Sequence, residues 1–270
     1  MRKPNQDNYI IKKNVTGIEN AWLLSVCDGH GDHGHFVSEF IKKVFPQVLQ
    51  NLSRGLNPTE NLNLKGLGQQ RPAQIGKTLK KSPEQQEEEP TQLQKPLYDV
   101  FTMPAEQRDQ LITLAYKALQ EKMVISGKHD SVMSGSTFVS VFCWNDRIVC
   151  ANSGDSRAIL CEKKDGKWRV IALSRDHKPD DPDELARIRK KGGKVEQSRL
   201  LPGMCPPRQV GMLVGPARVW LKNKPLPGLA MSRSIGDMVV KPVGVTEEPE
   251  ITVHGSQTAE KEFVGEPKGH

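Results

Sequence analysis

The sequence predicts an α+β fold in which antiparallel strands pack against amphipathic helices. Between residues 135 and 173, β-rich segments follow one another after short turns. These strands must be antiparallel, because a parallel crossover needs a dozen or more residues. Apolar residues also recur at helical spacing over residues 36–49 and 104–126, which predicts two core-facing helices. A chain of 270 residues can form one large domain with a sizeable core, or two small ones.

The charge, the cysteines and the apolar runs of the sequence limit which classes of protein it could belong to. The net charge of +7 could favour acidic partners. However, no block of Lys and Arg alternates with aromatic residues, so we interpret the charge as a solvated surface and expect no nucleic-acid partner. The five cysteines lack CxxC spacing, which suits reduced thiols. With no signal peptide and no apolar run of membrane-spanning length, we expect an intracellular monomer, cytoplasmic, nuclear or both. Peripheral membrane association is left open.

A buried strand over residues 22–27 is expected to present the first functional groups at its end. The apolar run stops at Asp28-Gly29-His30, where glycine permits backbone geometry that other residues resist. Asp28 can supply a hard oxygen ligand, and the carbonyl of Gly29 can turn toward the same ion. His30 titrates near neutral pH and can exchange protons. Groups at the end of a rigid strand are well placed for catalysis.

An acid near the start of the chain, Asp7, would complete an oxygen-rich set with Asp28. Such sets suit Mg²⁺ or Mn²⁺, and carboxylates at strand ends support two-metal phosphoryl chemistry. Two alternatives remain at this point. The imidazoles of His30, His33 and His35 could bind Zn²⁺, or the loop could be a glycine-rich turn without a function.

A polar insertion lies between the two predicted helices. The first helix would begin close to Gly34, directly after the loop, and would be perturbed or broken near Pro46. Residues 52–97 are dominated by Gln, Asn, Lys, Pro and Glu, so we interpret them as a low-complexity insertion within the domain. The second helix would begin near Pro104.

The second half of the chain alternates strands and turns. A strand over 136–143 ends at a turn near Asn145, and Asp165-Gly166 predicts a hairpin between strands 156–161 and 168–173. Asp181, Pro182 and Glu184 predict a helix that begins with a capping box. Residues 198–217 are expected to form a long loop, residues 228–237 a short helix or tight turn, and residues 250–254 a last strand.

Several motifs occur in the order found in one known family. They are NQDN at 5–8, CDGHGDHG at 27–34, SGST at 134–137, NSGDSRAIL at 152–160, DHKPDDPDELARI at 176–188, GG at 192–193, RVWLKN at 218–223, LAMSRSIGD at 229–237 and PEIT at 249–252. Through these motifs the chain resembles the metal-dependent protein phosphatases (PPM family, the type 2C protein serine/threonine phosphatases). The resemblance implies a two-sheet antiparallel β-sandwich flanked by helices, formed by a single domain over residues 1–264 and followed by a polar tail at 265–270.

The resemblance also implies roles for individual residues. Asp28 would bridge two Mg²⁺ or Mn²⁺ ions, with Gly29 and Asp7 in the same metal cluster. Arg2 would bind phosphate. His30 would be the general acid that protonates the departing Ser or Thr oxygen. The implied activity is hydrolysis of phosphoserine and phosphothreonine in proteins by a metal-activated water, without a phosphoenzyme.

Three departures from the family pattern bear on this expectation. Gln6 stands where some members carry a Glu ligand, and Val132 stands where the family often has an acid, with Asp130 two residues away. Asp130 is therefore only a supporting candidate. Asp237, in the LAMSRSIGD motif, is a second supporting candidate, as part of the scaffold near the site. The family's DGxW-type segment and later Asp-Asn pair have no counterpart before His270, so the fold is expected to be incomplete at its C-terminus. A truncated chain or pseudophosphatase that binds phosphoproteins without hydrolysing them is the alternative function.

Overall fold

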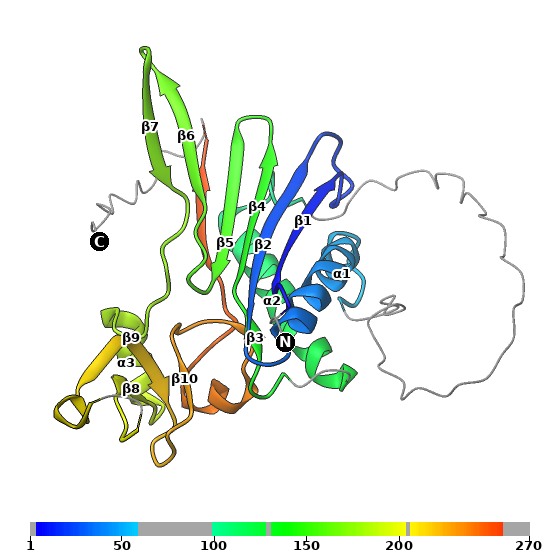
Figure 1. Cartoon of the computed structure of the whole chain (residues 1–270). Coiled ribbons are helices and arrows are strands. Elements are labelled where there is room, and N and C mark those ends of the chain that lie inside the picture. The colour runs from blue at the N-terminus through cyan, green and yellow to red at the C-terminus, as the bar shows by residue number, and fades with distance from the viewer. Residues whose placement is uncertain (1–3, 59–98, 128–130, 204–205, 256–270) are drawn as a thin grey trace, which may run out of the picture.

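The computed structural model describes residues 4–58, 99–127, 131–203 and 206–255, and the statements below concern these residues. Its centre is a seven-stranded antiparallel sheet (Figure 1). The sheet strands are β1 (Asp7–Lys13), β2 (Trp22–His30), β3 (Gly135–Ser136), β4 (Phe138–Trp144), β5 (Arg147–Ser153), β11 (Ile235–Gly236) and β12 (Glu250–His254). The order β11-β3-β2-β4-β5-β12, with β1 paired to β2, confirms the predicted antiparallel arrangement.

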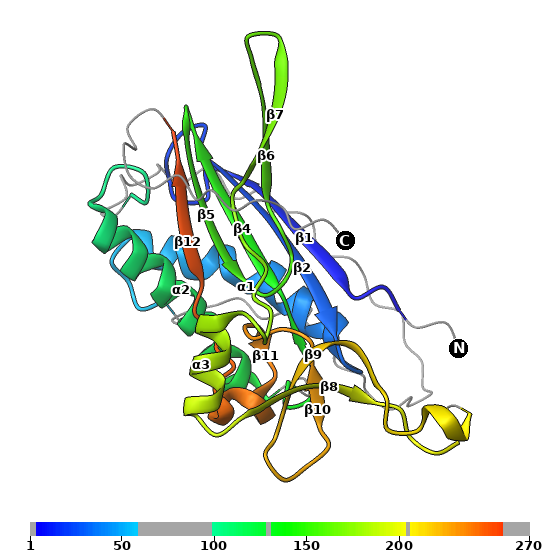
Figure 2. The same ribbon diagram turned by 90° about the vertical axis from the view of Figure 1, so that its left-hand side faces the viewer.

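Alternation along β2 explains why the sheet has one covered and one open face. Successive strand residues point to opposite faces, and in β2 Leu23 and Cys27 are fully buried while Leu24 and Val26 are exposed. The buried set faces two long helices, α1 (Gly34–Ser53) and α2 (Ala105–Ser126). Both helices run along the same side of the sheet (Figure 2).

The main core lies between this sheet face and the two helices. Tyr116 of α2 is fully buried, and its hydroxyl donates to the backbone oxygen of Ala151 at 2.9 Å. Its ring packs against Phe45 and Phe138. The helix α1 continues through Pro46 to Ser53, so the predicted break is wrong, and the helix includes the first two residues of the predicted insertion. The surrounding core outweighs the hydrogen bond that the proline cannot donate.

The opposite sheet face is covered only in part. The hairpin of β6 (Ile159–Lys164) and β7 (Lys167–Ala172) leads into Leu173, which packs with Val139 and Cys150 above β4 and β5. Over β1 and β2, the outward apolar side chains are exposed: Tyr9, Ile11, Trp22, Leu24 and Val26. The second layer of the expected sandwich is therefore represented by this hairpin among the described residues, and the sheets do not close.

A smaller unit lies at one end of the sheet (Figure 1). It contains α3 (Pro182–Lys190), the 3-10 turns η1 (Pro207–Gln209) and η2 (Met238–Val243), and the sheet of β8 (Lys194–Arg199), β9 (Leu213–Trp220) and β10 (Pro227–Leu229). Residues 213–217 pair with β8, so the predicted long loop is shorter than expected. None of the described helices is long and apolar enough to cross a membrane.

Two local predictions in this unit are wrong for a common reason: tertiary contacts override local propensity. Residues 228–237 do not form the predicted short helix or tight turn. Residues 228–229 belong to β10 and residues 235–236 form β11, and the amide of Ser234 donates to the oxygen of Thr246 at 2.9 Å. Glu184 does not complete a capping box. It is fully buried and accepts hydrogen bonds from Arg187 and Arg233 instead, while Asp181 makes no side-chain cap.

Candidate active site

The predicted carboxylates meet at one end of the open sheet face. Asp7 of β1 lies directly opposite Asp28 of β2 in the antiparallel register, and side chains of such cross-strand pairs lie on the same face. Burial raises the pKa of Asp28, and the neighbouring carboxylate of Asp7 raises it further. The pair therefore concentrates negative charge that a bound cation would relieve.

The loop after Asp28 is held tightly by its neighbours. The amide of Gly29 donates to the backbone oxygen of Gln6 at 3.2 Å, and a Cβ built on Gly29 would lie 2.4 Å from the backbone oxygen of Gly34. The amide of Asp28 donates to Thr137 Oγ1 at 3.0 Å. Gly29 is thus required for a close backbone approach, and the SGST segment fixes Asp28 from the other side.

His30 is paired with a residue that lies 207 positions away in the chain: its Nε2 lies 2.7 Å from Asp237 Oδ2. Burial alone would lower the pKa of His30, but the carboxylates of Asp237, Asp28 and Asp155 outweigh it and raise the pKa. A supporting residue predicted from the sequence, Asp237, therefore directly contacts the predicted general acid.

The pairing of three strands, β2, β3 and β11, brings His30 and Asp237 into contact. His30 pairs with Gly135 of β3, and Gly135 pairs with Gly236 of β11, one residue before Asp237. A Cβ on Gly135 would lie 2.2 Å from Asp237 Oδ2 and 2.8 Å from His30 Nε2. Only glycine therefore permits the histidine and the aspartate to approach each other over β3.

The sequence reasoning did not single out Asp155, which belongs to the same neighbourhood. Its negative charge raises the pKa of both Asp28 and His30, and Lys178 Nζ donates to its Oδ2 at 2.6 Å. The next residue, Ser156, has its Oγ 2.6 Å from Thr137 Oγ1, which in turn accepts from the Asp28 amide. The position of Asp155 after β5, which pairs with β4, was the available signal.

The donor set fits one hard cation. Mg²⁺ commonly binds through one or two carboxylates and keeps several waters, and Asp7 and Asp28 provide two carboxylates side by side. Within the described residues, no group of three or more His, Cys, Asp and Glu side chains is placed to hold a metal ion. The structure thus gives no support to the zinc alternative, and the expected second Mg²⁺ or Mn²⁺ ion would need further ligands.

Two predicted site residues, Arg2 and Asp130, lie outside the described residues. His33 and His35 stay near the loop, but the ring of His35 packs on Phe36 with 4.0 Å between ring centroids. The amide of His33 donates to Ser134 Oγ at 3.0 Å. These contacts hold the two histidines at the start of α1.

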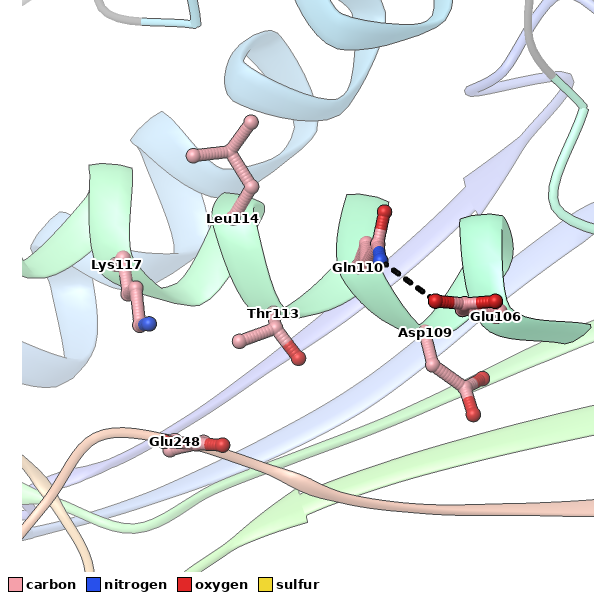
Figure 3. Close-up of a pocket in the computed structure, with 7 residues that line it drawn as sticks. All are labelled: Glu106, Asp109, Gln110, Thr113, Leu114, Lys117 and Glu248. Atoms are coloured by element: carbon pink, nitrogen blue, oxygen red, sulfur yellow. Dashed lines mark hydrogen bonds between the residues drawn. The ribbon is translucent and has the colours of Figure 1, made fainter.

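A surface hollow of about 510 Å³ lies between one side of α2 and the segment that carries Glu248 (Figure 3). Its lining residues are Glu106, Asp109, Gln110, Thr113, Leu114, Lys117 and Glu248. Gln110 donates to Glu106 across one helical turn at 3.3 Å. None of the predicted site residues lines this hollow, so we place the site at Asp28 and His30 on the strength of their chemistry.

Comparisons with known proteins indicate the same family as the sequence motifs. The family described as Protein phosphatase 2C matches residues 73–264. Probable protein phosphatase 2C 72 of Arabidopsis thaliana is 32% identical over 254 residues, which cover 93% of this chain and 60% of that protein. Probable protein phosphatase 2C 12 of Oryza sativa subsp. japonica is 30% identical, over 92% of this chain and 60% of that protein. The chain therefore spans about three fifths of the length of these relatives.

Solved structures support the fold. A serine-threonine phosphatase 2C from Toxoplasma gondii superposes with a TM-score of 0.60 at 20% identity, over 95% of this chain and 71% of that one. A C. elegans sex determining protein gives a TM-score of 0.57 at 18% identity, over 96% of this chain and 47% of that one. Together with the family match over more than half of the sequence, these findings confirm the resemblance: the chain belongs to the protein phosphatase 2C family.

Proposed function

We propose that the chain is a protein serine/threonine phosphatase that hydrolyses phosphoserine and phosphothreonine. The main supporting observation is the paired carboxylates of Asp7 and Asp28 with the imidazole of His30 two residues further along the same strand. Family membership supports phosphatase activity in general terms. The preference for Ser and Thr and the dependence on Mg²⁺ or Mn²⁺ are parts of the proposal.

Each group has a distinct task in the proposed reaction. Asp7, Asp28 and the carbonyl of Gly29 would hold a divalent ion, and Arg2 would bind the phosphate. When bound, the ion would supply positive charge to the phosphoryl oxygens and lower the pKa of the attacking water. The water oxygen forms the new bond to phosphorus as the bond to the Ser or Thr oxygen breaks. His30 gives its proton to that oxygen, so the products are phosphate and a neutral hydroxyl.

The test is hydrolysis of a phosphoserine peptide by the folded chain with Mn²⁺ or Mg²⁺ supplied. Asp28→Asn removes the central charge and is expected to lower kcat/KM by about 10²-fold or more, the range found when a group that stabilises transition-state charge is lost. Asp165→Asn, in the exposed turn of the β6–β7 hairpin, is the matched control and should retain activity. A folded, ion-supplied chain that never releases phosphate contradicts the proposal.

One observation favours a second candidate. Because the described residues contain no larger cluster of metal-binding side chains, the site could bind phosphoproteins without hydrolysing them. In that case a phosphopeptide would bind in a calorimetric titration, the unphosphorylated peptide would not, and no phosphate would be released. We keep the intracellular location and the phosphoprotein partners as parts of this proposal, consistent with free thiols at Cys27, Cys143, Cys150 and Cys161.

A further inference from the structure

A buried hydrogen-bond chain runs from Ser234 through Asp237 to His30. Ser234 Oγ donates to Asp237 Oδ2 at 2.6 Å, and His30 Nε2 lies 2.7 Å from the same oxygen. Ser234 is fully buried and Asp237 is 2% exposed. A buried carboxylate is costly unless it is hydrogen-bonded, so these two contacts hold the Asp237 side chain in one orientation.

The backbone around this chain leaves it little freedom. The amide of Ser234 donates to the oxygen of Thr246 at 2.9 Å, and the amide of Asp237 donates to the oxygen of Ser134 at 3.0 Å. Asp237 itself adopts a left-handed conformation with φ of 50°, which fixes the direction in which its side chain leaves the backbone. Groups supported in this way keep a functional side chain within the narrow geometry that catalysis needs.

The contact with Asp237 distinguishes the two ring nitrogens of His30. A carboxylate at Nε2 keeps a proton on that nitrogen. Nδ1 is enclosed and has no hydrogen-bond partner among the described residues. In serine hydrolases a carboxylate holds one imidazole nitrogen while the other exchanges the catalytic proton. By the same logic, Nδ1 is the nitrogen left to exchange the catalytic proton.

We propose that Asp237 and Ser234 are positioning residues for His30. Asp237 orients the imidazole through Nε2, and Ser234 fixes the side chain of Asp237. This inference rests on the proposed function, because it concerns the proton donor named there. It adds that proton delivery to the leaving oxygen depends on two side chains that need not touch the substrate.

The dependence on the leaving group tests this inference. An alkoxide from phosphoserine needs a proton as it departs, whereas nitrophenolate from nitrophenyl phosphate is a good leaving group without one. We expect Asp237→Asn to lower kcat for a phosphoserine peptide by about 10²-fold, within the range for general acid catalysis, and kcat for nitrophenyl phosphate by only about threefold. Ser234→Ala should show the same pattern with a loss of about tenfold or more on the peptide, as for one hydrogen bond to a charged group.

Equal losses on both substrates would overturn the inference, because a residue that binds the ion or only supports the fold affects both reactions alike. An unchanged peptide rate in both variants would overturn it as well. The matched control is Ser53→Ala, which removes another buried hydroxyl, bonded to the oxygen of Gln50 at 3.0 Å at the far end of α1. This control should retain both rates.

Proton NMR of the ion-free chain supplies a readout that does not depend on activity. We expect a downfield Nε2–H resonance that His30→Gln removes and that Asp237→Asn and Ser234→Ala shift upfield. If the chain hydrolyses no phosphopeptide but this pattern is observed, the positioning contact stands and the proposed function fails. If neither Asp237→Asn nor Ser234→Ala moves the resonance, the positioning contact is wrong, whether or not the chain is a phosphatase.

Discussion

Replacing Gly135 by alanine provides a sharp test of the site geometry. The added Cβ would lie 2.2 Å from Asp237 Oδ2, whereas real Cβ contacts are essentially never shorter than 3.0 Å. The aspartate, the histidine or the strand β3 must therefore shift by about 0.8 Å. Overpacking of this kind costs roughly 1–3 kcal/mol, and a loss of about 2 kcal/mol lowers Tm by roughly 4–8 °C in a domain of this size.

The assay must separate lost stability from lost geometry. Gly127 has φ of +54° and no atom within 4 Å of a built Cβ, so Gly127→Ala costs roughly 1–2 kcal/mol through backbone strain alone. We expect both variants to lose comparable Tm in a thermal melt. Only Gly135→Ala should also lose phosphopeptide hydrolysis, by about 10-fold or more, at temperatures where both are folded. Equal activity in the two variants would refute the claim that β3 sets the contact between His30 and Asp237.

Three further predictions concern other parts of the chain. Mg²⁺ or Mn²⁺ at 100 times its Kd should raise the free energy of unfolding by about 2.7 kcal/mol, and Asp28→Asn should abolish this gain in a thermal melt. Burial alone would raise the pKa of Glu184, but hydrogen bonds from Arg187, Arg233 and Ser232 outweigh it and hold the pKa far below its ordinary value of 4.5. The stability from this carboxylate is therefore present above pH 4.5 and is lost as the pH falls below it; in urea unfolding, Glu184→Gln should flatten that acid slope, and an unchanged slope would contradict the argument. Ile11→Lys should reduce concentration-dependent light scattering, because Ile11 belongs to the exposed apolar face of β1 and β2, whereas Ile125→Lys on α2 should not.

The sequence predicts the elements whose periodicity is local. The apolar stripe of α1 and the alternation of β2 follow directly from the residues that face the core. The β11 segment could not be predicted in this way, because its strand character comes from pairing with Gly135, about a hundred residues earlier. The same holds for Glu184. Its position in the sequence predicts a helix cap, but the partly buried side chains of Arg187 and Arg233 bind its carboxylate instead.

The site was predictable to a similar extent. Asp28 and His30 stand at the visible end of an apolar strand, and that position alone marks them. The contact between His30 and Asp237 depends on three strands meeting at Gly135, so only the motif order pointed to Asp237. Asp155 lies two residues after the end of β5. Its neighbour Ser156 contacts Thr137, and no spacing along the chain reveals that contact.

The pleat of β2 explains how the two tasks of the proposed site are kept apart. Asp28 and His30 are two residues apart on one strand, so their side chains leave the same face about 7 Å apart along it. Gly29, between them, points to the other face and packs against the backbone of Gly34. The carboxylate pair proposed to bind the cation thus depends on the partner strand β1, which carries Asp7. The position of the proposed proton donor His30 depends on β3, through Gly135, and on Asp237, which directly follows β11. Because the two sides depend on different neighbours of β2, a change at Asp237 can impair proton delivery while the carboxylate pair stays in place.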